Sequence, residues 1–213
     1  MTYRRNRIPL GSAVAACVAG ALATAPRHAL AERLSNIDTA QPYYQASDLG
    51  ITVNPVFTGG TLLMNQSDTS YLENFTLDGS GTNTINLDGN TSTFTGVFSD
   101  ATLGTPGSII ITSGLGGEAL FAGVNTYTGT TAIGPGATLG LSGAGSIATS
   151  SHVEDDGTFD VSAATTPPAI MSLAGTGQVD LGANTLTLPA ASDTFGGIIG
   201  GLGGLAINGM LGL

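Results

Sequence analysis

The 213-residue chain is rich in glycine and poor in charge, with 33 glycines, no lysine and only 9% charged residues. This composition excludes a disordered chain, because disordered chains are highly charged and poor in apolar residues, and glycine without a three-residue period excludes collagen. From Glu32 onward one arginine stands against fifteen acidic residues, a formal net charge of −14. Such a surface excludes nucleic-acid binding, which requires clustered Lys and Arg.

The N-terminal segment, up to Ala31, has the three parts of a secretory signal peptide. Three arginines lie at positions 4, 5 and 7, an uncharged and mostly apolar run occupies residues 8–25, and a small-x-small cleavage motif is formed by Ala29, Leu30 and Ala31. We expect this segment to form a helix and to be cleaved after Ala31. The mature chain then begins at Glu32, and the export machinery is its first partner.

Two other interpretations of this segment are weaker. A membrane anchor is disfavoured because Pro9 and two glycines interrupt an apolar run that is barely long enough to span a bilayer. A lipoprotein signal is suggested by residues 14–17, but Cys17 lies in the middle of the run rather than at its end. Cys17 is the single cysteine, so the cleaved chain has no disulfide, thiolate metal site or cysteine nucleophile.

After residue 35 helical periodicity is absent, and short apolar segments end in Gly, Asn, Asp or Ser. Short apolar segments separated by such turn residues are typical of short strands joined by turns. In chain order we expect strands at residues 61–64, 75–77, 84–87, 94–98, 108–112, 119–121, 131–133, 137–141, 158–161, 169–173, 178–181, 185–188 and 194–199.

The sequence also repeats itself imperfectly. Residues 77–91 match residues 173–185 in the pattern Leu-x-Gly-x-Gly, spacer, apolar-x-Leu-x-x-Asn-Thr, and residues 59–64 match residues 136–141. Many short strands also suit a sandwich or barrel. Imperfect repeats with Gly and Asn corners favour instead an all-β, right-handed parallel β-helix, whose stacked coils bury a continuous core. At roughly 20 to 25 residues per turn, the chain would make about seven to nine turns.

These observations predict three segments. The signal peptide occupies residues 1–31, a lead-in segment occupies residues 32–52, and the β-helical domain occupies residues 53–213.

One stretch, GVNTYTGTTAIGPGATLGL at residues 123–141, resembles the autotransporter-associated β-strand repeat. The resemblance is specific over residues 120–205 and weaker over residues 53–118, and residues 194–205 are similar to the start of a further repeat. The leucine pair of the motif arrives one residue late. The matching positions are Gly123, Asn125, Thr126, Tyr127, Thr128, Gly129, Thr131, Ile133, Gly136, Leu139 and Leu141.

Within this repeat we expect each residue type to have a structural role. Asn125 and Gly129 are expected at corners that need a left-handed backbone, with stacked Asn side chains pairing along the solenoid. Alternating strand positions are expected to point Ile and Leu inward. Tyr127 is expected to stack as an aromatic ring.

The resemblance implies a non-enzymatic exported passenger of type V secretion. Such a protein is a structural stalk or an adhesin-like surface protein of a Gram-negative bacterium, found in the periplasm, at the cell surface or outside the cell. Autotransporters end in an outer-membrane barrel built from many strands of about ten residues, and no such segment is seen here. We therefore expect a fragment, or a passenger-like protein without its translocator. Its ligand, a surface glycan or protein, is not identified by the sequence.

The last segment of the chain is apolar and uncharged. Residues 194–213 contain glycines at small-xxx-small spacing, which suits a membrane dimer, but eight glycines in this run make a poor helix. We favour an uncapped solenoid turn over residues 197–213, and uncapped strand edges invite self-association.

The sequence shows little catalytic chemistry. His152 with Glu154, Asp155 and Asp156 suggests a metal site or an acid–base pair, but acids beside glycine are typical of a solvated turn. We expect no catalytic residue, metal or cofactor. The alternative is a β-helix polysaccharide hydrolase or lyase with carboxylates on adjacent turns.

Overall fold

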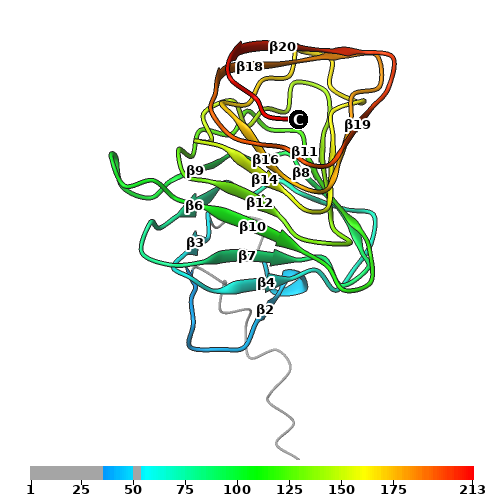
Figure 1. The fold of residues 1–213 in the computed structure, drawn as a ribbon. Coiled ribbons are helices and arrows are strands. Elements are labelled where there is room, and N and C mark those ends of the chain that lie inside the picture. The colour runs from blue at the N-terminus through cyan, green and yellow to red at the C-terminus, as the bar shows by residue number, and fades with distance from the viewer. Residues whose placement is uncertain (1–35, 50–53) are drawn as a thin grey trace, which may run out of the picture. The chain divides into compact units, whose positions relative to one another are not determined.

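The computed structural model describes residues 36–49 and 54–213, and this part of the chain is a parallel β-solenoid. About eight coils stack on one another. In Figure 1 one face of the stack runs from β2 in blue, through β10 in green, to β16 in yellow. The expected all-β coiled architecture is confirmed. The described residues contain one 3-10 turn, η1 (Ala46–Asp48), and no α-helix. The expected signal-peptide helix lies outside the described residues.

Three sheets and a terminal strand pair make up the solenoid, and every strand pair is parallel. Sheet A contains, in spatial order, β1 (Asn36–Ile37), β3 (Val56–Phe57), β6 (Phe75–Leu77) and β9 (Phe98–Asp100). Sheet B contains β2 (Tyr44–Gln45), β4 (Thr61–Leu63), β7 (Asn83–Asn86), β10 (Ile109–Thr112), β12 (Thr131–Ile133), β14 (Val153–Asp155) and β16 (Leu173–Gly175). Sheet C contains β5 (Thr69–Tyr71), β8 (Thr91–Phe94), β11 (Glu118–Phe121), β13 (Thr138–Leu141), β15 (Thr158–Asp160), β17 (Gln178–Asp180) and β19 (Ile198–Gly200). The pair at the end is β18 (Thr185–Ala191) and β20 (Gly204–Gly209).

The register places each repeat of the chain on one coil of the stack. In sheet C the register partners Thr138, Thr158, Gln178 and Ile198 follow one another at equal intervals along the chain. In sheet B, the interval between the partners Ile111 and Ile133 is slightly longer. Both intervals agree with the expected turn of roughly 20 to 25 residues. The expected spacing and number of turns are therefore confirmed, and residues that share a register position form columns along the stack.

The core consists of the inward-facing columns, because alternate side chains of each strand point to opposite faces. A single cluster of buried side chains extends from Ile37 to Phe195. Phe98 lies between Phe75 and Phe121, with ring centroids 4.8 Å from each and nearly parallel planes. Each buried aromatic ring contributes roughly 1.5 to 3 kcal/mol by its removal from water, and the offset stacking adds to this.

Several strand predictions differ from the structure. Residues 94–98 were expected as one strand, but β8 ends at Phe94 and β9 begins at Phe98. Between them the backbone turns from sheet C to sheet A at Gly96, where a Cβ would overlap the carbonyl oxygen of Glu73 in the preceding coil. The strands expected at 169–173 and 194–199 begin instead at Leu173 and Ile198. Strands β1, β2, β3, β5, β14 and β20 were not predicted. Within the segment expected as a lead-in, β1 pairs with β3 and β2 pairs with β4.

The two matching repeats lie on different faces of the solenoid. Residues 77–91 run from β6 through β7 to β8, whereas residues 173–185 run from β16 through β17 to β18. What they share is a local corner. The amide nitrogens of Asn90 and Asn184 each donate to a backbone carbonyl one coil away, from Met64 and Val161 respectively. The repeat in sequence therefore encodes a type of corner and not a position in the coil.

Candidate functional site

Asn125 of the repeat motif is a buried connector between three coils. Its side chain is 2% exposed, its Oδ1 accepts a hydrogen bond from the backbone N–H of Phe98 at 2.8 Å, and its Nδ2 donates to the carbonyls of Gly123 and Ser146. The expectation of Asn side chains pairing with each other is wrong for this residue, because its partners are backbone groups. Buried backbone groups need partners, and Asn125 satisfies them in the coils on both sides.

The expected left-handed corners are also wrong at Asn125 and Gly129, neither of which has a positive φ. Gly129 is needed for another reason, because a Cβ there would overlap the carbonyl oxygen of Gly107 in the neighbouring coil. Gly136 does adopt the left-handed region, with φ of 77°. The motif glycines therefore serve close coil packing at one corner and turn geometry at another.

Some of the other motif residues face the core, and others face solvent. Ile133, Leu139 and Leu141 are buried, as expected. Thr126 and Thr128 are exposed, and the Thr128 hydroxyl donates to Asp100 Oδ2 at 2.7 Å, one coil away. Gly123 packs against Gly96 of the adjacent coil.

Tyr127 lies wholly in the core, but it does not belong to the aromatic stack. Its hydroxyl is 2.6 Å from Thr131 Oγ1, which in turn is 2.9 Å from Ser150 Oγ. All three side chains are buried. Burial raises the pKa of Tyr127 above its usual range. The expected stacking role is thus replaced by a short buried hydroxyl chain across two coils, which gives the phenol its required partner.

The first two acids after His152 lie in a strand, whereas Asp156 is exposed in the bend that follows. Residues 153–155 form β14, and Asp155 faces the core with 0% exposure. Its Oδ1 accepts a hydrogen bond from the Gly157 N–H at 3.1 Å, while its Oδ2 has no partner. Burial raises the pKa of Asp155 to about 7, and the charge of Asp156 acts in the same direction. His152 and Glu154 are only partly buried, so the run does not converge on one site.

A second group of carboxylates lies on the outer face of sheet C. Asp160 and Asp180 are register partners in consecutive coils, and each accepts a backbone hydrogen bond from the residue two positions further on. Glu118 reaches toward them across Gly140, where a Cβ would lie 2.5 Å from its Oε1. Burial raises the pKa of Glu118, and the charge of Asp160 raises it further. Asp160 and Asp180 are carboxylates on adjacent coils, as the alternative enzymatic interpretation requires, while Glu118 lies two coils from Asp160.

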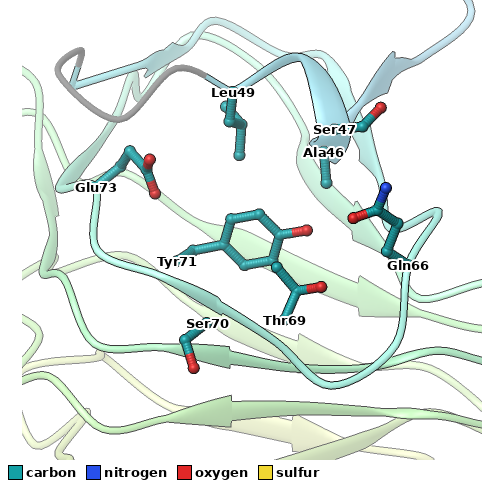
Figure 2. A pocket seen from close by; sticks show the side chains of 8 residues that line it. All are labelled: Ala46, Ser47, Leu49, Gln66, Thr69, Ser70, Tyr71 and Glu73. Carbon is teal, nitrogen blue, oxygen red and sulfur yellow. The ribbon is translucent and has the colours of Figure 1, made fainter.

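A pocket of about 210 Å³ lies near β5 at the first coils. Figure 2 shows the Tyr71 ring and the Glu73 carboxylate in the same hollow, with the side chains of Ala46 and Leu49 facing them from the opposite side. Tyr71 is 5% exposed and Glu73 is 8% exposed, and neither Tyr71 Oη nor Glu73 Oε2 makes a hydrogen bond of normal geometry. Burial raises the pKa of Tyr71, and the nearby Thr69 side chain offsets part of this rise. The lining residues are Ala46, Ser47, Leu49, Gln66, Thr69, Ser70, Tyr71 and Glu73.

Little in the sequence indicates this pocket. Residues 69–71 are polar apart from the tyrosine, and the pocket brings them together with η1, which belongs to the preceding coil. The only signal is Tyr71 and Glu73 at alternate positions, which places both on one face of an extended segment.

Neither metal clusters nor membrane-spanning helices are found in the described part of the chain. Within residues 36–49 and 54–213, no three His, Cys, Asp or Glu side chains are grouped so as to hold a metal ion. No helix in the same ranges is long and apolar enough to cross a bilayer. The expected cleavage residues Ala29, Ala31 and Glu32 lie outside these ranges.

Comparison with known proteins gives no match, whether with protein-family models, curated proteins or solved structures. The resemblance over residues 123–141 therefore rests on its motif positions, and the geometry of the coils supports a β-solenoid built from repeats.

Proposed function

We propose that the chain is a non-enzymatic, exported, passenger-like β-solenoid that acts as a structural stalk or an adhesin-like surface protein. The observation that carries this proposal is the single continuous core from Ile37 to Phe195. In a solenoid each coil contacts only its neighbours, so stability is distributed along the stack. Such an arrangement suits a spacer that holds exposed loops away from an anchoring point.

The surface chemistry agrees with this role. The acidic side chains lie on many successive coils, and several are held by local hydrogen bonds, as in the turns after Asp160 and Asp180. A high net charge of one sign keeps a protein soluble, because its copies repel one another. The resemblance of residues 123–141 to an autotransporter repeat and the signal-like N-terminus support export.

Export is tested by placing the full chain, with a C-terminal tag, in a Gram-negative host. We expect the tag in the periplasm, on the surface or in the medium, and digestion by protease added to intact cells would identify a surface location. The matched control lacks residues 2–31 and should stay in the cytosol. Equal cytosolic distribution of both proteins would contradict the proposal.

A polysaccharide hydrolase or lyase is the second candidate, and the carboxylates on sheet C favour it. Glycoside hydrolysis needs one carboxyl that stays protonated as the acid and a second that is ionised. The raised pKa of Glu118 suits the acid, and Asp160 on a nearby coil suits the partner. Release of reducing ends from a panel of polysaccharides, lost in both Glu118→Gln and Asp160→Asn, would support this candidate over the structural role.

A further inference from the structure

The pocket between η1 and β5 contains polar atoms that the rest of the fold leaves unsatisfied. Glu73 Oε2 and Tyr71 Oη are both buried, and neither makes a hydrogen bond of normal geometry, although the Thr69 side chain lies near Tyr71 Oη. A buried polar atom without a partner costs roughly 1 to 3 kcal/mol, and more when the group is charged. Two such atoms beside one cavity indicate that a bound molecule completes their hydrogen bonding.

A ligand that satisfies these atoms must donate hydrogen bonds and carry a positive charge. An ionised carboxylate only accepts hydrogen bonds, and buried carboxylates are normally paired with a cation. Residues 36–49 and 54–213 include no Lys or Arg. The described part of the chain therefore has no long basic side chain that could pair with Glu73.

The aromatic ring favours the same kind of ligand. One face of Tyr71 stacks on Phe94, with ring centroids 5.3 Å apart. Figure 2 shows the tyrosine ring crossing the pocket between the Glu73 carboxylate and the side chains of Ala46 and Gln66. Ring faces attract organic cations, most strongly when water is excluded.

The remaining lining groups indicate that the ligand carries hydroxyl groups. Ser47, Thr69 and Ser70 supply hydroxyls, and Gln66 supplies an amide that both donates and accepts. The volume of about 210 Å³ corresponds to about seven water molecules at ~30 Å³ each. This space is smaller than that of drug-sized sites and is suited to a ligand of about the size of one sugar ring.

We propose that this pocket binds a small protonated amine that carries hydroxyl groups, with Glu73 as the partner of the ammonium group and Tyr71 as a hydrogen-bonding and ring contact. A bare metal ion is a poorer occupant, because Glu73 is the single acidic residue in the lining. The site adds a binding activity to the proposed structural role and does not depend on it.

The test is titration of the purified protein with D-glucosamine below pH 7, followed by calorimetry or by chemical shifts of the tyrosine ring. D-glucose supplies the hydroxyls without the charge, and cyclohexylamine supplies the charge without the hydroxyls. We expect saturable binding of glucosamine, and at least tenfold weaker binding of both comparison compounds. Equal binding of glucose, equal binding of cyclohexylamine, or no saturation by glucosamine would each overturn the proposal, and so would equal saturation by calcium chloride alone.

Variants then locate the binding. Glu73→Gln keeps the shape but removes the charge, and we expect it to weaken glucosamine binding about ten- to hundredfold, as expected for loss of a charge-assisted hydrogen bond. Tyr71→Phe removes only the hydroxyl and should weaken binding less. Asp88→Asn removes an exposed carboxylate outside the pocket and should leave the affinity unchanged. Unchanged affinity in a folded Glu73→Gln protein would overturn the assignment, and the ligand series on the unaltered protein remains decisive if that variant does not fold.

Discussion

Asp155 occupies the core position that Ile133 occupies one coil earlier, because the two residues are register partners on β14 and β12. Ile85, Ile111 and Ile133 precede it in this column, and Gly175 follows it. A Cβ at Gly177 would lie 2.8 Å from Asp155 Oδ1, so the absence of a side chain there leaves room for the carboxyl group. A titratable group thus replaces an apolar one in the middle of the core.

This position predicts a pH-dependent stability. The folded-state pKa of Asp155, about 7, lies above the ordinary value of 3.8. The folded protein therefore binds the proton more tightly than the unfolded chain, and the free energy of unfolding should fall as the pH rises from about 4 to about 7. Asp155→Asn keeps the acceptor for Gly157 and removes the charge. It should raise the free energy of unfolding at pH 8 relative to the unaltered protein, on the order of 4 kcal/mol for a shift of this size.

The control for this prediction is Glu154→Gln, which removes a charge on the outer face of the same strand. The flanking strands β12 and β16 carry no titratable side chain, so Asp156 is the main charged neighbour. Urea unfolding at pH 5 and pH 8 measures the difference. The difference in free energy of unfolding between Asp155→Asn and the unaltered protein should depend on pH. The difference between Glu154→Gln and the unaltered protein should not. Identical pH profiles for all three would contradict a buried carboxyl at this position.

Asn125 should be needed for stability and not for a ligand contact. Asn125→Ala leaves the N–H of Phe98 and the carbonyls of Gly123 and Ser146 without their side-chain partner. Loss of partners at buried polar groups should lower the free energy of unfolding by about 2 to 4 kcal/mol. Asn208→Ala, at an exposed position in β20, should change it by less than about 0.5 kcal/mol. Similar effects of both changes, measured by thermal unfolding, would show that Asn125 is not a connector.

Alanine substitutions at two glycines distinguish the effect of close coil packing from the effect of backbone freedom. Gly129→Ala places a methyl group against the carbonyl of Gly107, and overpacking of this kind costs about 1 to 3 kcal/mol. Gly114→Ala meets no atom within 4 Å and has no positive φ. It should be neutral or stabilising by up to about 1 kcal/mol, because it restricts the unfolded chain. The opposite order of the two melting temperatures would refute the close coil contact.

The terminal coil should mediate self-association. Leu202 is 96% exposed and Met210 is 80% exposed, in a run from Thr194 to Leu213 without any charge. Elsewhere the acidic surfaces repel each other, so association should increase with salt. The double change Leu202→Glu with Met210→Glu should shift sedimentation toward the monomer.

Leu103 provides the matched control for this end, because it is fully exposed but lies far from the terminal coil in sequence. Leu103→Glu should leave sedimentation unchanged. A chain that is monomeric at high protein concentration and high salt, or an equal effect of the Leu103 change, would contradict association through the terminal coil.

The coiled architecture was predictable because alternation and corner residues are local signals. Strand β6 has apolar residues at alternate positions, and both β6 and β12 were expected at the residues where they occur. Strand β14 was missed because its inward positions are Val153 and Asp155, and a carboxylate at an inward position imitates a turn. In that case the register imposed by the neighbouring coils outweighs local propensity.

The pocket and the carboxylates on sheet C could not be predicted, since both depend on which coil lies beside which. Glu118 and Asp160 are distant in sequence, and only the stacking of β11, β13 and β15 brings them to one face. Ile133 and the two leucines of the motif face the core as expected, but the roles expected of Asn125 and Gly129 were wrong. Those roles arise from backbone groups in adjacent coils, which spacing within one repeat does not reveal.

The measurement that tests the proposed role most directly is the N-terminal residue of the protein recovered from outside the cytosol of a Gram-negative host. The proposal predicts a chain that begins at Glu32, because the small-x-small motif ends at Ala31. Mass spectrometry of the intact protein gives this residue without any variant. A chain that begins at Met1 and stays in the cytosol would contradict export, and a lipid-modified start at Cys17 would contradict the cleavage site.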